Sequence, residues 1–111
     1  MTNKSEIKLI VELDKENIPE KIFWEADQKD QPGLSETKSF SLSLWDHSTK
    51  NTLRIDLWSK DMPVEDMKRF YIDCLGGLAQ SVLNATGDEY MSSEMNALCD
   101  KFVTHLKNEL S

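Results

Sequence analysis

The side chains that could do chemistry in this chain are few and widely spaced. They comprise two histidines, His47 and His105, and two cysteines, Cys74 and Cys99. None of them has a partner at the ligand spacing of a zinc site. Neither cysteine has a CxxC partner or an adjacent histidine that would activate its thiol. We therefore expect no metal site, and we interpret both cysteines as small hydrophobic residues of the core.

Paired carboxylates occur at Glu65-Asp66 and at Asp88-Glu89. Both pairs fall at expected helix ends, where the helix dipole and solvation are sufficient to explain them. The chain contains no GxSxG elbow, no GxxxxGK[ST] phosphate loop and no GxGxxG fingerprint. The sequence therefore predicts no catalytic residue and no cofactor, and we expect a protein that is not an enzyme.

Composition narrows the class of partner. The 111 residues carry a net charge of -7, and Lys and Arg form no cluster. Binding to nucleic acid or to an anionic membrane surface depends on such clusters, so both are disfavoured. The apolar run Leu9 to Val11 is too short for a signal peptide, and no stretch approaches the ~20 apolar residues of a membrane span. We expect an acidic, cytoplasmic protein without membrane insertion and with reduced cysteines.

Hydrophobic residues alternate with polar ones along most of the first half of the chain. This period of two predicts strands at about 6-13, 20-27, 38-46 and 51-59. Short connections favour antiparallel pairing of sequential strands, because a parallel neighbour needs a long crossover. The polar segment 28-37 contains Pro32-Gly33 and is expected to be a loop.

The period changes at Pro63, which suits the first turn of a helix. Apolar residues at three- and four-residue spacing predict helices at about 63-86 and 92-110, with Gly87 capping the first and Ser92 or Ser93 capping the second. Gly76-Gly77 interrupts the first helix. We expect these glycines to allow a close approach of the second helix or the sheet, with a kink as the alternative.

The expected fold is α+β: residues 1-111 form one domain, in which a four-stranded antiparallel sheet is followed by two C-terminal helices packed on one face. The helices leave the opposite sheet face uncovered. Because side chains alternate along a strand, four residues are expected on that face: Trp45, Arg54, Asp56 and Trp58. We take them as candidate interaction residues, since exposed tryptophan is typical of binding surfaces. In the alternative, loops or strand ends bury both rings. An open edge strand or sheet face would also allow a homodimer.

Three runs resemble the GldC family, the gliding motility-associated proteins of Bacteroidetes-type bacteria. TLRIDLWSKDMPVEDMK at 52-68 is similar to the strand-to-helix run of that family. KSEIKLIVELDKENIPEKIFWEA at 4-26 resembles its start, and LNATGDEYM at 83-91 resembles its inter-helix segment. At Gly76-Gly77 the family is expected to carry larger residues.

The resemblance implies a small cytoplasmic accessory protein that supports gliding, with no enzymatic activity and no cofactor. Two mechanisms stay open. An adaptor would bind one folded partner in the gliding or associated secretion machinery through Trp45, Arg54, Asp56 and Trp58. A chaperone would bind many unfolded segments, and the expected order of four strands and two helices is similar to that of the export chaperone SecB.

Overall fold

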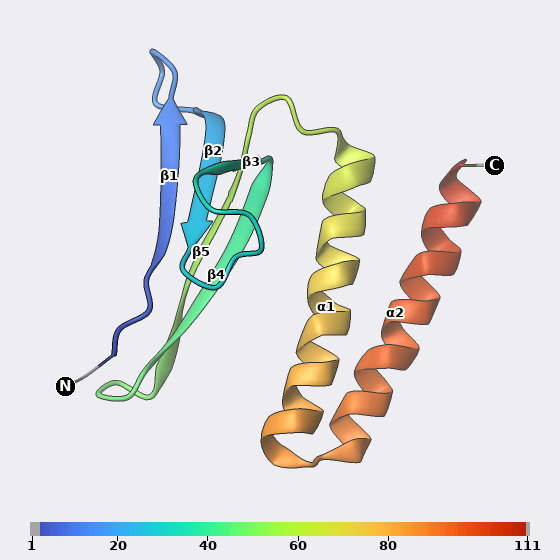
Figure 1. The fold of residues 1–111 in the computed structure, drawn as a ribbon. Helices are drawn as coiled ribbons and strands as arrows, with labels where there is room; N and C mark the ends of the chain where they lie inside the picture. Colours follow the sequence, from blue (N-terminus) through green and yellow to red (C-terminus); the bar gives the residue numbers. More distant parts are fainter. Residues whose placement is uncertain (1–2, 111) are drawn as a thin grey trace. The chain divides into compact units, whose positions relative to one another are not determined.

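A computed structural model describes residues 3-110. The chain divides between Met62 and Pro63 into two compact units, strands in the first and helices in the second (Figure 1). The α+β class with two C-terminal helices is thereby confirmed. The strands are β1 (Ile7–Leu13), β2 (Pro19–Ala26), β3 (Ser35–Thr37), β4 (Ser39–Asp46) and β5 (Asn51–Trp58), and the helices are α1 (Val64–Thr86) and α2 (Glu89–Leu110).

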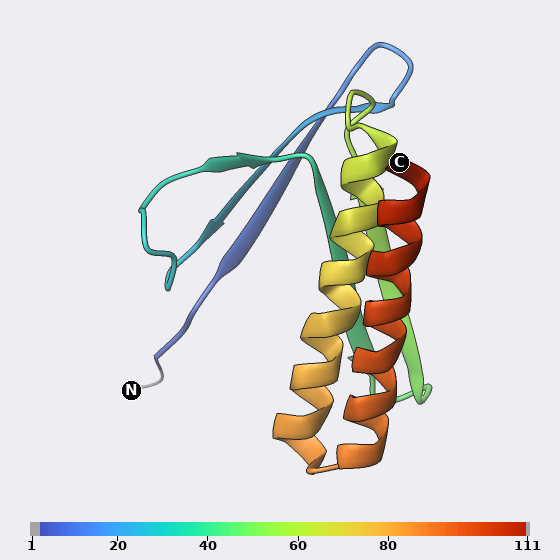
Figure 2. The ribbon, with the colours of Figure 1, turned by 90° about the vertical axis from the view of Figure 1, so that its right-hand side faces the viewer.

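The prediction of one four-stranded sheet is wrong. The strands form two small antiparallel sheets, one in the order β1-β2-β3 and one of β4 with β5. Figure 2 shows the two sheets diverging within the strand unit. The additional strand, β3, lies inside the segment 28-37 that we expected to be a loop. Its three residues, SET, are too few and too polar to give a period-two signal.

The reason for two sheets is a bend at Lys38, the single residue between β3 and β4. Before the bend, Ser35–Thr37 pairs with β2, and after it Ser39–Asp46 pairs with β5. The carbonyl oxygen of Lys38 accepts a hydrogen bond of 2.8 Å from the Ser59 N–H. The segment 35-46 therefore consists of two strands that meet at the bend and have different partners. Because β3 occupies the edge of β2, β4 cannot pair there.

The β1–β2 turn is organised by Asp14. Its carboxylate accepts hydrogen bonds from the Glu16 N–H at 2.8 Å and the Ile18 N–H at 3.1 Å. The Lys60 ammonium donates to the same carboxylate at 3.0 Å, and the Lys60 N–H donates to the Pro19 carbonyl oxygen. These bonds lower the pKa of Asp14, the one from Ile18 most strongly. They connect the turn to the segment that follows β5.

Helix α1 begins after Pro63 without a side-chain cap and has Glu65 and Asp66 in its first turn. It ends at Gly87, as expected, with φ 73° and an N–H that donates to the Leu83 carbonyl oxygen at 2.9 Å. Only glycine adopts this left-handed conformation without a steric cost, and it is the usual residue after a helix C-terminus.

The start predicted for the second helix is wrong. Helix α2 begins at Glu89, because the Asp88 carboxylate accepts a hydrogen bond from the Met91 N–H at 2.9 Å and so acts as the N-terminal cap. Ser92 is buried inside the helix, and the Ser93 hydroxyl donates to the Tyr90 carbonyl oxygen. An aspartate directly after Gly87 was the available sequence signal for this cap.

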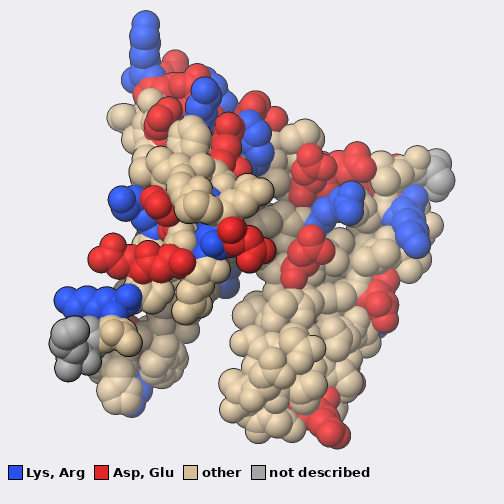
Figure 3. All heavy atoms as spheres, viewed as in Figure 1, with Lys and Arg blue, Asp and Glu red and all other residues tan. Residues whose placement is uncertain are grey.

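The two helices form an antiparallel hairpin, in which Ala79 of α1 and Ser92 and Leu106 of α2 are buried (Figures 1 and 2). The Lys68 ammonium bonds the Glu109 carboxylate at 2.8 Å near the open end. Figure 3 shows that the half of the hairpin near its turn is largely uncharged, since residues 74-86 contain no charged side chain. Neither described helix has a stretch apolar enough to cross a membrane.

Helix α1 is continuous through Gly76 and Gly77, so the kink considered from the sequence does not break it. A Cβ at position 76 would lie 3.9 Å from the Cys99 sulfur, an ordinary van der Waals contact, so Gly76 lies beside α2 at a distance that an alanine would also allow. A Cβ at position 77 would meet no described atom within 4 Å. Close helix approach therefore requires glycine at neither position.

Candidate protein-interaction site

The candidate residues lie on one face of the β4–β5 ribbon, which we call the tryptophan face. Cross-strand partners point to the same side of an antiparallel pair, and residues two apart along a strand share a side. The register therefore assigns eight residues to this face in four facing pairs: Ser39 with Trp58, Ser41 with Asp56, Ser43 with Arg54 and Trp45 with Thr52.

Both indole rings of this face are accessible to solvent. Trp45 is 61% exposed and Trp58 is 46% exposed. The alternative in which loops bury both rings does not occur in the described structure. Because Trp58 faces Ser39 and Trp45 lies six residues further along β4, the two rings are separated by roughly 20 Å. They occupy opposite ends of the face.

The structure brings Arg54 and Asp56 together between the two rings. The Arg54 Nε donates to one Asp56 carboxylate oxygen at 3.2 Å, and Nη2 donates to the other at 3.1 Å. Nη2 also donates to the Ser41 hydroxyl oxygen at 3.0 Å, and this hydroxyl in turn donates to Asp56. The three side chains form a closed network across the two strands.

This network changes the ionisation of its carboxylate. The Arg54 guanidinium, followed by the Ser41 hydroxyl, holds the pKa of Asp56 below its usual value. A general base that works at neutral pH needs a pKa closer to 7. Asp56 is therefore favoured in its ionised form, bonded to Arg54.

A shallow hollow of about 200 Å³ lies beside Trp58. The pockets that hold small-molecule ligands usually measure ~300 Å³ or more, so this hollow is better matched to a single side chain of a partner. Its lining comes from the start of β2 and the end of β5: Ile18, Pro19, Asp56, Leu57, Trp58 and Lys60.

Several residues of this site were not found from the sequence. The sequence placed Ser41 on the same face as Trp45, because serines alternate with apolar residues along this strand. Its pairing with Asp56 could not be predicted, because that depends on the β4–β5 register. Ile18 and Pro19 carried no signal, because they are far from Trp58 in the sequence and reach it only through the contact of β2 with β5. Lys60 lies two residues after Trp58, and no pattern distinguished it.

The opposite face of the same ribbon is apolar, and we call it the leucine face. It consists of three facing pairs, Phe40 with Leu57, Leu42 with Ile55 and Leu44 with Leu53. Leu44, Leu53 and Ile55 are each about half exposed. The ribbon therefore presents two chemically different surfaces, one apolar and one of tryptophan, serine and paired charges.

Comparison with known proteins gives one match. The family model described as gliding motility-associated protein GldC-like matches residues 19–108. No curated protein and no solved structure gives a significant match. The matched range contains both tryptophans of the tryptophan face, the Arg54–Asp56 pair and nearly all of both helices. Since the match covers most of the chain, this protein belongs to the family of GldC-like, gliding motility-associated proteins.

Proposed function

We propose that the protein is a non-enzymatic adaptor that supports gliding motility by binding one folded protein partner through the tryptophan face. The observation that carries the proposal is the exposure of two indole rings, Trp45 and Trp58, on either side of an ordered Arg54–Asp56 ion pair. Tryptophan and arginine are the residues most enriched among the energetic centres of protein interfaces.

The arrangement of the tryptophan face supports an interface more than a reaction. Arg54 is held by Asp56 and Ser41 before any partner arrives, so less side-chain entropy is lost on binding. The hollow beside Trp58 can accept one partner side chain. We place the protein in the cytoplasm, with a partner in the gliding or associated secretion machinery.

The first experiment locates the partner. A photoreactive phenylalanine analogue at position 58, in a gliding bacterium that carries the protein, should crosslink one protein of the gliding or secretion machinery. The matched control places the analogue at position 90, because Tyr90 is an exposed aromatic residue of the helical unit. A crosslink from both positions, or from neither, would contradict a discrete surface around Trp58.

The second experiment tests function. Trp45→Ala and Trp58→Ala should each reduce gliding in a strain that lacks the chromosomal copy, and Tyr90→Ala should not. Protein abundance and circular dichroism must match the wild type in each strain. Full gliding with both tryptophans replaced would remove the case for this surface.

A second candidate function is a chaperone similar to SecB. The observation that favours it is the half-exposed leucine face, since chaperones present apolar surface to many unfolded segments. An aggregation-suppression assay with unrelated unfolded proteins separates the two functions. Suppression that survives Trp45→Ala and Trp58→Ala supports the chaperone, whereas a single partner that is lost with Trp58→Ala and no suppression supports the adaptor.

A further inference from the structure

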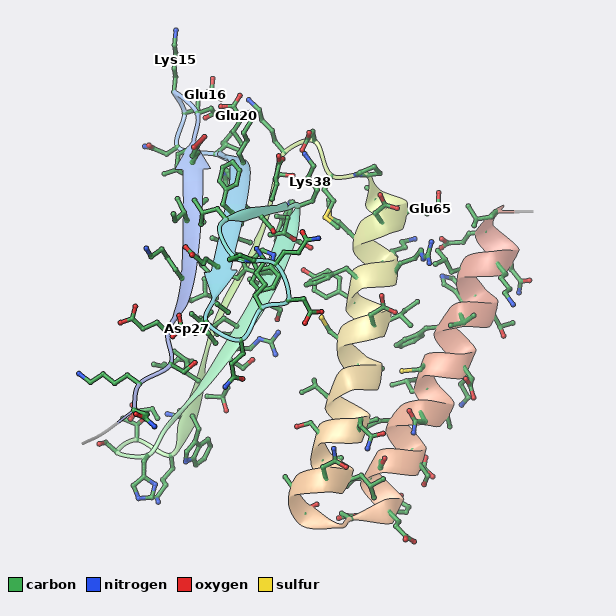
Figure 4. The ribbon with its side chains drawn as sticks, in the orientation of Figure 1. Lys15, Glu16, Glu20, Asp27, Lys38 and Glu65 are labelled. Carbon is green, nitrogen blue, oxygen red and sulfur yellow. The ribbon has the colours of Figure 1, made fainter. Side chains whose placement is uncertain are left out.

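Strand β1 is the outer strand of the three-stranded sheet. Among the described residues it pairs with β2 alone, along its whole length from Ile7 to Leu13 (Figure 2). Figure 4 marks the two ends of this edge, with Lys15 and Glu16 at the turn and Asp27 opposite. Proteins usually keep outer strands short or interrupt them with proline, because an open edge pairs readily with another strand. This seven-residue edge is neither short nor interrupted by proline; it carries the charges of Lys8 and Glu12, and its ladder shifts register between Glu12 and Leu13.

The phase of the β1–β2 ladder shows which backbone groups face outward. The Asp27 N–H donates to the Glu6 carbonyl oxygen at 3.2 Å, one step beyond the register pair of Ile7 with Ala26. In an antiparallel ladder, hydrogen-bonded pairs alternate with pairs whose N–H and C=O groups point away. The even-numbered residues of β1 therefore bond to β2. The odd-numbered residues direct their backbone groups to the free edge: Ile7, Leu9, Val11 and Leu13.

The side chains of β1 are complementary to those of a second β1 that runs in the opposite direction. A second β1 in antiparallel orientation must place its own odd-numbered residues opposite the odd-numbered residues of the first copy, because only these have free backbone groups. Registers that pair odd-numbered with even-numbered residues are therefore excluded. In the register centred on Ile10, Ile7 faces Leu13 of the second copy and Leu9 faces Val11. Lys8 faces Glu12 twice, once on each side of the two-fold axis. Every position of β1 has a partner of matching chemistry. Just beyond the strand Glu6 faces Asp14, whose carboxylate is already paired with the Lys60 ammonium.

The neighbouring permitted registers are worse. Centring on Leu9 places Glu6 opposite Glu12, two like charges, and leaves Lys8 opposite Ile10. Centring on Val11 places the Glu12 carboxylate opposite Ile10. It also places Lys8 opposite Asp14, but the Asp14 carboxylate is already bonded within its own turn and to Lys60. Opposite charges stabilise facing positions of a sheet, and like charges destabilise them. The charges of β1 thus select the register that also uses its full length.

We propose that the protein forms a two-fold symmetric homodimer by antiparallel pairing of β1 with β1 of a second copy, in the register centred on Ile10. The pairing adds roughly eight backbone hydrogen bonds and joins the two three-stranded sheets into one continuous sheet. It also covers Ile7 and Leu13, which are 77% and 52% exposed in the single chain. A closed two-fold contact of this kind leaves no further β1 edge open. It uses no residue of the tryptophan face.

Charge exchange tests the register in the full chain. Sedimentation velocity over a concentration series should show a dimer for the wild type. Lys8→Glu and Glu12→Lys should each weaken the dimer about tenfold, because each replaces two opposite-charge pairs with two like-charge pairs. The double variant Lys8→Glu/Glu12→Lys should restore wild-type association, since the pairs are then opposite again. A monomer at every concentration, or a double variant as weak as the singles, would overturn the proposal.

A crosslink gives a second and independent readout. The two copies of Ile10 face each other across the axis as a pair without mutual hydrogen bonds, with Cα atoms about 4.5 Å apart, which is within the span of a disulfide. In a chain with Cys74 and Cys99 replaced by Ala, Ile10→Cys should form a disulfide-linked dimer on mild oxidation. Lys8→Cys in the same background should not, because its facing residue is Glu12. A crosslink from Lys8→Cys alone would show a different register.

Discussion

Arg54 and Asp56 lie two residues apart on β5 and form a two-point ion pair, with both carboxylate oxygens bonded by the guanidinium at 3.2 and 3.1 Å. The strand geometry produces this contact, because residues at i and i+2 share a face. Ser41 closes the network from β4. The polar centre of the tryptophan face is therefore ordered in the isolated chain.

The first prediction concerns the ionisation of Asp56. Its side-chain carboxyl should titrate below the usual pKa of aspartate, because Arg54 and Ser41 stabilise the charged form. Since the folded pKa lies below the unfolded one, the network stabilises the fold fully above the unfolded pKa, and this contribution is lost as pH falls through the folded pKa. Carbon-detected NMR of the side-chain carboxyl measures the titration.

Arg54→Gln should return the Asp56 titration toward the usual aspartate range. Asp46 is the internal control, because its pKa is also lowered, but by Thr49 and Ser48 of its own turn. Its titration should not change in the Arg54→Gln protein. An unchanged Asp56 titration in that protein would contradict the ion pair.

A second prediction uses fluorescence to compare the tryptophans. Single-tryptophan variants that retain Trp45 or Trp58, with the others replaced by Phe, should be quenched strongly by acrylamide. The variant that retains Trp24 is the matched control and should be quenched less. Trp24 is half-buried, and the Lys29 ammonium lies 4.8 Å from its ring centroid. Equal quenching of all three would contradict the exposed face.

The glycines of the helical unit give a third prediction. Gly77→Ala should raise the free energy of unfolding by about 0.5 to 1 kcal/mol, because an alanine Cβ meets no described atom within 4 Å and alanine loses less backbone entropy in a helix. Gly87→Ala is the control and should lower it by about 1 kcal/mol, since Gly87 has φ 73°. Urea denaturation measures both. A destabilising Gly77→Ala would indicate a contact at position 77 that the helix hairpin does not contain.

A fourth prediction tests the start of α2. Asp88→Ala should reduce stability by about 1 kcal/mol, because the Met91 N–H loses its side-chain acceptor. Ser93→Ala should change it by less than about 0.5 kcal/mol, since Ser93 is an exposed residue within the helix. A larger loss of stability for Ser93→Ala than for Asp88→Ala would show that Ser93 is the cap.

The sequence was sufficient where a local pattern controls the structure. Strands β1, β4 and β5 form where apolar residues alternate, and α1 lies between Pro63 and Gly87. Parity alone predicted that Trp45, Arg54, Asp56 and Trp58 share a face. That residues 1-111 form one domain stays a prediction.

The sequence was insufficient where the structure depends on pairing between segments that are distant in the chain. Strand β3 is held by β2 and not by any pattern of its own, so neither the strand nor the division into two sheets could be read locally. The hollow beside Trp58 requires Ile18 and Pro19, which reach it only after β2 and β5 come together. Asp88 was overlooked because Ser92 and Ser93 are equally good caps in isolation.

The single residue between β3 and β4 restricts where insertions and deletions can occur in this chain. Figure 4 labels Lys38, whose ammonium bonds Asp61 at 3.1 Å and Glu36 at 3.2 Å. Because side chains alternate along β4, inserting or deleting one residue at this junction would exchange the tryptophan face and the leucine face relative to the first sheet. Relatives that keep both surfaces should therefore show no single-residue gaps at this junction, while the segment 28-34 tolerates them.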